Sequence, residues 1–383
     1  MIGKVDSLEK ILFFEAKDGD GFYDFYGCCC YPLKFIFPID SIRGFSKFIQ
    51  SCFSSLIIIN AMIFVESEFA PLQTVVLAES EFGMPKVPRE EDLKFLRPEA
   101  FTEMYEKAGM DYAEAYPESQ QAWENERIAL EAVLTKHGVK VLRPRRLTTA
   151  EKRAAGDDGY ANFFARDPFF TIGNLVIEGS LRFLHRRMEI LPIRDIILKN
   201  VYPEDCMYVA APRPEVAAAD DLTLGPGPFI EGGDVLVLDK HIFVGNSGLA
   251  SNALGARWLE KLLKPHGYTL EMLRLQPEIL HLDCALGLIR EGLMVICEAA
   301  FKDGVPEKLR SWDRIPVTLE ETSLLATNGL PISPEVYVTD PVFKHIGEKI
   351  AQHGVKVEYV DFQVSRSLGG AFRCSTQPLL RKS

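Results

Sequence analysis

A His-Gly pair recurs at the same place in three helix-to-strand segments, and this recurrence constrains the fold more than any other feature of the sequence. The pairs are His137-Gly138, His266-Gly267 and His353-Gly354. Glycine readily adopts the left-handed conformation that ends a helix, and a histidine there lies at the negative end of the helix dipole. A strand is expected after the pairs, for example at residues 139–142. We therefore expect one α/β module to be reused along the chain as a degenerate repeat.

Paired strands lie between these modules. Residues 234–238 and 241–245 are rich in apolar and β-branched side chains, and the two residues between them fit the tight link of a hairpin. Further strands are expected at residues 72–79 and 293–297, and an amphipathic helix is expected at residues 120–136. Because hairpins accompany the alternating helices and strands, we expect an α/β fold other than a doubly wound parallel sheet.

The composition excludes several classes of protein. A formal net charge of −11 over 383 residues, without a long basic run, speaks against a nucleic-acid partner. Neither glycine-rich phosphate-binding motif occurs, so no nucleotide cofactor is expected. The eight cysteines form no C-x-x-C pair, which speaks against a metal site and against a disulfide framework. Free thiols favour a reducing, cytoplasmic location.

The N-terminal part of the chain does not match the rest. Residues 48–65 are apolar enough for a buried strand or a membrane segment, but Gln50, Asn60 and three serines make them a poor spanning helix. Acidic residues further upstream speak against a mitochondrial transit peptide. We expect residues 1–61 to be an extension outside the core and residues 62–383 to form a single catalytic domain. A membrane anchor is the less favoured alternative, and no membrane partner is expected.

The most informative chemical feature is Cys374, which closes the run Gly369-Gly370-Ala371-Phe372-Arg373-Cys374. A glycine pair lets the backbone turn tightly and leaves the sulfur uncrowded. Taken alone, such a cysteine is more often a small buried apolar residue than a nucleophile.

Three other segments carry groups that a nucleophilic sulfur would need. Asp167 precedes a proline and is therefore expected in a turn or in extended backbone. Glu231 lies in Glu-Gly-Gly-Asp ahead of a strand, where functional sites are often built. In His281-Leu282-Asp283, the first and third side chains would share one side of a strand. Each segment alone also fits an ordinary structural role: a turn aspartate, an acidic loop and a buried histidine.

Taken together, these groups fit chemistry at a guanidinium carbon. Carboxylates match the planar fork of guanidinium N–H donors bidentately. A thiolate can add to the central carbon while a histidine protonates the departing amine. A bound cation would also favour the thiolate, which offsets the opposing effect of the carboxylates.

The segments that contain Asp167, Glu231 and His281, followed by the run that ends at Cys374, make four motifs. In this order along the chain, they resemble the motifs of the guanidino-group-modifying superfamily, which includes arginine deiminases, dimethylarginine hydrolases and amidinotransferases. The likeness runs from about Glu66 to Ser383 and opens with residues 70–77, which are similar to the first strand of that superfamily. The resemblance implies a five-bladed α/β propeller (pentein fold) of degenerate ββαβ modules, with the site in its central channel.

The resemblance also implies roles for the residues of these motifs. Cys374 would be the nucleophile that forms a covalent amidino-thioether. His281 would be the general acid and base, and Glu231 would support it. Asp167 and Asp283 would hold the guanidinium group of the substrate.

A carboxylate on the substrate would need a cationic partner. Residues 181–189 are similar to an arginine-rich segment of the superfamily, and Arg182 and Arg187 are the preferred candidates, with Arg186 in the same cluster. Arg366 is a further candidate. These arginines could equally form a charged surface that contacts only solvent.

Two details resemble the glycine amidinotransferase branch: residues 239–259 and the aromatic Phe372 two residues before the cysteine. Glu231-Gly232-Gly233-Asp234 is closer to the deiminases, and Arg373 replaces the usual histidine. We expect an amidinotransferase that moves the amidino group of arginine, or of a related small guanidino compound, to an amine acceptor. The alternatives are a hydrolase of the same superfamily that yields citrulline and a non-catalytic protein that binds arginine-like ligands. The oligomeric state stays open, with a homodimer among the options.

Overall fold

The computed structural model describes residues 12–16, 23–27, 63–87, 94–214 and 225–383. The chain divides into two compact units, Met1–Asn60 and Ala61–Ser383. In the first unit, β1 (Leu12–Ala16) pairs antiparallel with β2 (Tyr23–Gly27). Most of the apolar segment at residues 48–65 lies outside the described residues. None of the helices in the described ranges is long and apolar enough to cross a membrane.

Four three-stranded sheets of the second unit share one pattern, in which an antiparallel hairpin is followed by a third strand parallel to its second strand. These sheets consist of β8 (Phe169–Ile172), β9 (Leu175–Glu178) and β10 (Met207–Ala210); β11 (Val235–Leu238), β12 (His241–Asn246) and β13 (Thr269–Arg274); β14 (Leu286–Arg290), β15 (Leu293–Ile296) and β16 (Asp313–Pro316); and β17 (Leu330–Ser333), β18 (Val336–Thr339) and β19 (Lys356–Tyr359).

A four-stranded sheet repeats the same pattern with strands from both ends of the unit. β20 (Thr376–Arg381) pairs antiparallel with β4 (Leu72–Leu77), and β4 pairs parallel with β6 (Lys140–Leu142). The short β3 (Phe64–Val65) extends the other side of β20. A separate antiparallel pair joins β5 (Glu81–Gly83) to β7 (Tyr160–Asn162). The mixture of hairpins and parallel third strands confirms the expected α/β class.

The His-Gly pairs end helical segments as predicted. Gly138, Gly267 and Gly354 all have positive φ, between 77° and 81°. The strands that follow them are β6, β13 and β19, each the parallel third strand of its sheet. In each repeat, the helical segment that ends at the His-Gly pair is therefore the connection that leads the chain back to the sheet, where the third strand adds in parallel.

The predicted hairpin at residues 234–245 is also confirmed, with Leu238 opposite His241 and Asp239 at φ 52°. Its first strand begins at Val235, because Gly232–Asp234 form a one-turn 3-10 helix. The predicted helix at residues 120–136 starts earlier, at Pro117, where proline suits the first helical turn.

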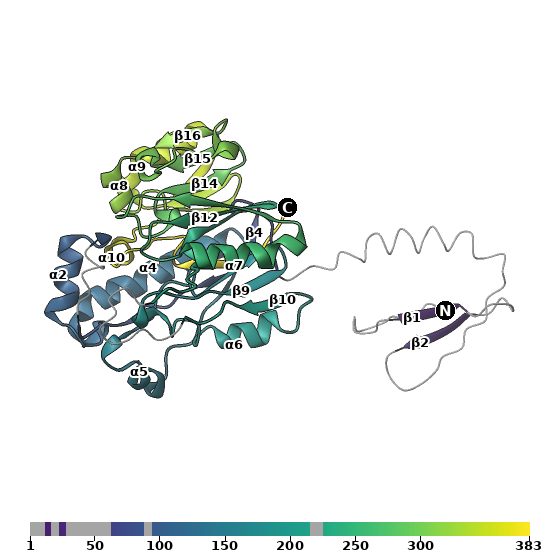
Figure 1. Ribbon diagram of the computed structural model, residues 1–383, viewed down its shortest axis with the longest axis horizontal. Coiled ribbons are helices and arrows are strands. Elements are labelled where there is room, and N and C mark those ends of the chain that lie inside the picture. The colour runs from purple at the N-terminus through teal and green to yellow at the C-terminus, as the bar shows by residue number, and fades with distance from the viewer. Residues whose placement is uncertain (1–11, 17–22, 28–62, 88–93, 215–224) are drawn as a thin grey trace. The chain divides into compact units, whose positions relative to one another are not determined.

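Helices connect the sheets, and in the second unit Figure 1 shows α2, α8 and α9 to the left of the strands, with α5 and α6 below β9 and β10. The helices are α2 (Pro98–Glu106), α3 (Tyr112–Ala115), α4 (Pro117–Lys136), α5 (Thr149–Ala155), α6 (Arg194–Ile196), α7 (Ala253–Leu263), α8 (Leu319–Ser323), α9 (Lys344–Gln352) and α10 (Gln363–Ser367). The largest apolar core contains residues of β4, β14, β15 and β17, so these strands provide a rigid base for the loops that precede them.

We expect a chain that begins at Ala61 to unfold cooperatively with a melting temperature within about 1 °C of the full-length protein, less than a 1 kcal/mol change would produce. The reason is that Ala61–Ser383 is a compact unit in its own right. Differential scanning calorimetry measures this. A chain that begins at Ala70 is the control, since it also lacks β3 and the buried Glu68 and should melt at a clearly lower temperature. A large loss of stability in the first truncation would place part of residues 1–60 in the core.

Candidate active site

The chemically important side chains occupy equivalent places in the repeated sheets, in the loops just ahead of a strand. Asp167 lies two residues before β8, and Glu231 lies four residues before β11. His281 and Asp283 precede β14, and Cys374 lies two residues before β20. The same placement, in a loop just ahead of a strand, therefore brings residues more than 200 positions apart in the sequence to one cavity.

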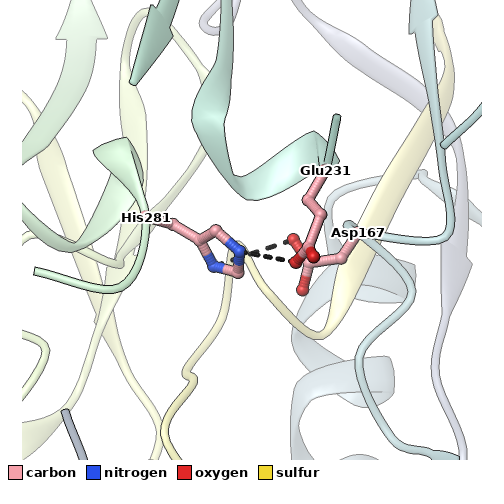
Figure 2. A group of neighbouring side chains, drawn as sticks. All are labelled: Asp167, Glu231 and His281. Atoms are coloured by element: carbon pink, nitrogen blue, oxygen red, sulfur yellow. Dashed lines mark hydrogen bonds and ion pairs between the residues drawn. The ribbon is translucent and has the colours of Figure 1, made fainter. Parts of the chain in front are cut away.

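The imidazole of His281 faces two buried carboxylates, those of Glu231 and Asp167 (Figure 2). Its Nε2 is 2.9 Å from Glu231 Oε2, and its Nδ1 is 3.9 Å from Asp167 Oδ1. Burial opposes the charged form, but the negative charge of Asp167 and the hydrogen bond to Glu231 outweigh it and raise the pKa of His281 to about 10. At neutral pH the ring is thus an imidazolium that can act as a proton donor.

Arg186 neutralises the acids around this histidine. Its guanidinium donates to Asp167 Oδ2 at 2.8 Å and to both carboxylate oxygens of Glu189, and it lies 3.7 Å from Glu231. Burial alone would raise the pKa of Asp167, but the positive charges of His281 and Arg186 lower it below its ordinary value. Asp167 also accepts the backbone N–H of Gly233 at 2.7 Å, which fixes its orientation.

The same three side chains are the one candidate metal cluster in the described part of the chain. Ligand atoms of Asp167, Glu231 and His281 lie within 4.8 Å of one another. However, both carboxylates already accept charged or backbone donors, and Arg186 contacts both of them. A divalent cation would have to displace these donors, so the arrangement suits a held imidazolium better than a metal ligand set.

Asn328 and Asp283 determine the environment of the Cys374 thiol. Asn328 Nδ2 donates to Sγ at 3.2 Å, and Sγ lies 3.5 Å from Asp283 Oδ2. The Asn328 side-chain oxygen accepts the backbone N–H groups of Ala371 and Cys374, so one residue shapes the loop and contacts the sulfur. Burial, together with the negative charges of Asp283 and Asp167, raises the pKa of Cys374 well above its ordinary value. The thiol is therefore protonated until a positive charge approaches it.

The prediction that His281 and Asp283 share one side of a strand is wrong. Residues Leu282–Cys284 form a one-turn 3-10 helix, and only His281 has extended backbone. The turn forms because Asp234 Oδ1 accepts the backbone N–H of Leu282, which pins the segment to the loop before β11. Asp283 is thereby directed to the thiol of Cys374, while His281 faces Glu231.

Arg373 has a structural role that the sequence motifs did not reveal. Its buried guanidinium bonds Glu68 at 3.0 and 3.1 Å and Asp283 at 2.9 Å. It also donates to the carbonyl oxygens of Val235 and Gly232. Burial opposes the guanidinium charge, but Glu68 and Asp283 outweigh it and raise the pKa of Arg373 further. The residue that stands before the nucleophile thus ties its loop to the loops ahead of β4, β11 and β14.

One cavity contains the thiol, the imidazole and Asp167. Its free space is about 40 Å³, room for a few water molecules. Five phenylalanines line it, and we call them the aromatic wall: Phe82, Phe95, Phe163, Phe164 and Phe183. Leu96, Leu280 and Leu368 complete its apolar lining. A substrate must therefore push some of these side chains aside to reach the sulfur.

The two arginines expected to bind a substrate carboxylate do not line this cavity. Arg182 donates to the carbonyl oxygen of Leu249 at 2.9 Å, and Arg187 donates to the carbonyl oxygens of Leu181 and Arg182. Their neighbour Arg186 is the arginine that lines the cavity. Arg366 pairs with Asp340 at 2.8 Å.

Sequence reasoning missed Asn328 and the role of Glu68. A signal for Asn328 was present, because it lies two residues before β17, at the same place as Asp167 before β8 and Cys374 before β20. Glu68 offered no such signal, since its partner Arg373 is 305 residues away.

Comparisons with known proteins show a likeness to amidinotransferases. No model of a protein family matches the chain. An inosamine-phosphate amidinotransferase of Streptomyces glaucescens is 26% identical over 348 residues, which cover 84% of this chain and 97% of the relative. The mitochondrial glycine amidinotransferase of Gallus gallus is 23% identical over 355 residues, which cover 82% of each chain.

Solved structures show the same fold. An amidinotransferase of the saxitoxin biosynthetic pathway from Microseira wollei superposes with a TM-score of 0.70 at 21% identity, over 84% of this chain and 98% of the other. The DDAH of Pseudomonas aeruginosa superposes with a TM-score of 0.55 at 18% identity, over 80% of this chain and 99% of the other. The resemblance that the sequence motifs indicated is confirmed.

We expect Arg373→Gln to lower the free energy of unfolding by about 3–5 kcal/mol, because it leaves the buried carboxylates of Glu68 and Asp283 without their cation. Urea denaturation followed by fluorescence measures the change. Arg146→Gln is the matched control, since its ion pair with Glu124 is exposed and should contribute less than about 1 kcal/mol. Equal losses in the two variants would contradict the central role of Arg373.

Proposed function

The chain belongs to the guanidino-group-modifying superfamily, and on that basis we propose that it is an amidinotransferase that works through a covalent intermediate on Cys374. One observation carries the proposal. A protonated imidazole, a carboxylate and a buried thiol line the same cavity, and a second carboxylate contacts the thiol. The donor is arginine or a related guanidino compound, and an amine is the acceptor.

Substrate binding begins with the carboxylates. Asp167 and Asp283 each hold one internal guanidinium already, but carboxylate oxygens have further lone pairs that can accept N–H donors of a second one. A guanidinium placed between them brings a positive charge close to Sγ. Because Asp283 and Asp167 are among the causes of the raised pKa of Cys374, neutralising their charges lowers that pKa and releases the thiolate.

The first chemical step forms the C–S bond. The thiolate adds to the central carbon of the guanidinium, and the tetrahedral adduct then expels its alkylamine. His281 gives its proton to the departing nitrogen and becomes a neutral imidazole. Glu231 holds the ring in place through Nε2 and stabilises its charged form before the transfer. The products of this step are the amine and an amidino-thioether on Cys374.

The second step reverses these roles. An acceptor amine attacks the amidino carbon, the neutral His281 takes one of its protons, and the C–S bond breaks to return the thiolate. If ammonia leaves in the first step in place of the alkylamine, and water then attacks the carbon, the same groups release citrulline and the enzyme is a hydrolase. This is the alternative that the superposition with DDAH keeps open, because that likeness concerns the fold. A third alternative is a protein that binds arginine-like ligands without turnover.

The remaining sequence-based expectations are part of the same proposal. The repeated hairpin-plus-parallel-strand sheets support a five-bladed α/β propeller with the cavity at its centre. The cytoplasmic location, the homodimer and the assignment of residues 1–61 to an extension outside the catalytic domain stay predictions. Arg182 and Arg187 also stay candidates for contact with a substrate carboxylate, though neither lines the cavity.

We expect ornithine to form from arginine only when an amine is present, because transfer needs an acceptor to resolve the thioether. Amino-acid analysis by mass spectrometry measures the products. Cys374→Ala should abolish turnover and retain the fold, whereas Cys206→Ala, outside the cavity lining, should remain active. Citrulline formed without any amine would favour the hydrolase. Binding of arginine with neither product would favour the ligand-binding alternative.

We expect kcat to rise with pH as the Cys374 thiol, whose pKa the bound guanidinium lowers, becomes easier to ionise, and to fall above pH of about 10, where His281 loses its proton. Asp167→Asn removes a negative charge 3.9 Å from Nδ1, so it lowers the pKa of His281 and moves the falling limb to lower pH. Asp157→Asn, at an exposed ion pair, is the control and should leave the limb in place. An unmoved limb in Asp167→Asn would contradict His281 as the acid.

A further inference from the structure

The aromatic wall lies directly beside the nucleophile. Phe164 packs against Gly370 so closely that a Cβ on that glycine would lie 2.4 Å from the ring and 2.8 Å from Cβ of Cys374. Phe163 meets Phe164 edge to face at 4.5 Å, and Phe82 meets Phe163 at 5.2 Å. A group attached to the sulfur, or an amine that enters to react with that group, therefore meets ring surfaces in the same cavity.

Among the described residues, the charged groups of the cavity are acids near the thiol and two cations that are already paired. Acids lie at its base, where Asp167 lines the space and Asp283 contacts the thiol. In the described part of the chain, Arg186 is the one arginine or lysine that lines the cavity. Its guanidinium already contacts the carboxylates of Asp167, Glu189 and Glu231. His281, the cavity's imidazolium, is likewise held by Glu231.

The aromatic wall and the acids of the cavity together favour some acceptor amines over others. An ammonium group is attracted by the acids at the base, and an apolar substituent gains by burying its surface against the rings. A carboxylate or phosphate next to the amine would be buried near Asp167, with Arg186 already engaged by three carboxylates, so it would lose its hydration and be repelled by the acids. His185 also lines the cavity, and its ring centroid lies 6.2 Å from that of Phe82, within the apolar surface.

Resting on the proposed transfer reaction, we propose that the acceptor is an alkyl or arylalkyl amine whose carbon skeleton bears no acidic group. Phenethylamine and phenylalanine are a matched pair for this class, since they differ only in a carboxylate on the carbon next to the amine. The donor is less restricted, because in arginine the carboxylate is separated from the guanidinium by a chain of carbons.

The test supplies arginine at saturating concentration and measures ornithine and the guanidino product by mass spectrometry. We expect kcat/KM for phenethylamine to exceed that for phenylalanine by roughly tenfold to a hundredfold. Phe95→Arg places a cation in the half-buried part of the aromatic wall and should narrow this ratio, whereas Phe95→Leu keeps the wall apolar and should preserve it. Circular dichroism establishes that each variant is folded. If Phe95→Arg does not fold, the ratio of the unaltered protein decides alone.

Equal or faster transfer to phenylalanine would overturn the proposal while leaving the transfer reaction intact. If no amine supports turnover, the transfer reaction fails, and binding to Cys374→Ser decides the selectivity separately. Calorimetric titration of that variant should then give a dissociation constant at least about tenfold lower for phenethylamine than for phenylalanine, in line with the same selectivity. A lower dissociation constant for phenylalanine would reject the selectivity as well.

Discussion

The buried guanidinium of Arg373 is the interaction on which the rest of the site depends. It contacts Glu68 ahead of β4 and Asp283 ahead of β14, and it also bonds backbone oxygens at Gly232 and Val235. These groups come from three of the repeated sheets, and Arg373 is covalently next to the nucleophile. A buried cation with several fixed partners resists displacement, because any shift leaves a charge unpaired in a poorly solvated interior. The position of Cys374 is thus determined by charge pairing as much as by the glycines before it.

The cluster around His281 contains more acids than cations can neutralise. Burial is the largest cause that raises the pKa of Glu189 and of Asp234, and each reaches about 7 although Arg186 and His281, respectively, oppose the shift. Near neutral pH these two carboxyls therefore share protons with the solvent, while His281 keeps its own. A cationic substrate entering such a cluster improves its charge balance, whereas an anion worsens it.

The sequence predicted the repeat and the hairpin at residues 234–245, since glycine caps and turn residues act locally. It also singled out Asp167, His281 and Cys374, which line one cavity. It did not predict the 3-10 turn at Leu282–Cys284, which depends on a bond from a loop 48 residues away. It also did not identify Arg186 as the arginine of the cavity, because adjacent residues in an irregular segment have no periodicity that shows which side chain faces inward. Asn328 could have been found by aligning the repeats, since it fills the pre-strand position of β17.

The small volume of the cavity has a consequence for the fate of a thioether on Cys374. With about 40 Å³ of free space behind the aromatic wall, few water molecules can stand near the sulfur at any moment. Water and amine compete for the same electrophilic carbon, so the outcome depends on which of them the cavity admits. The packing of phenylalanine rings can therefore set how much of the thioether passes to an amine and how much is lost to water.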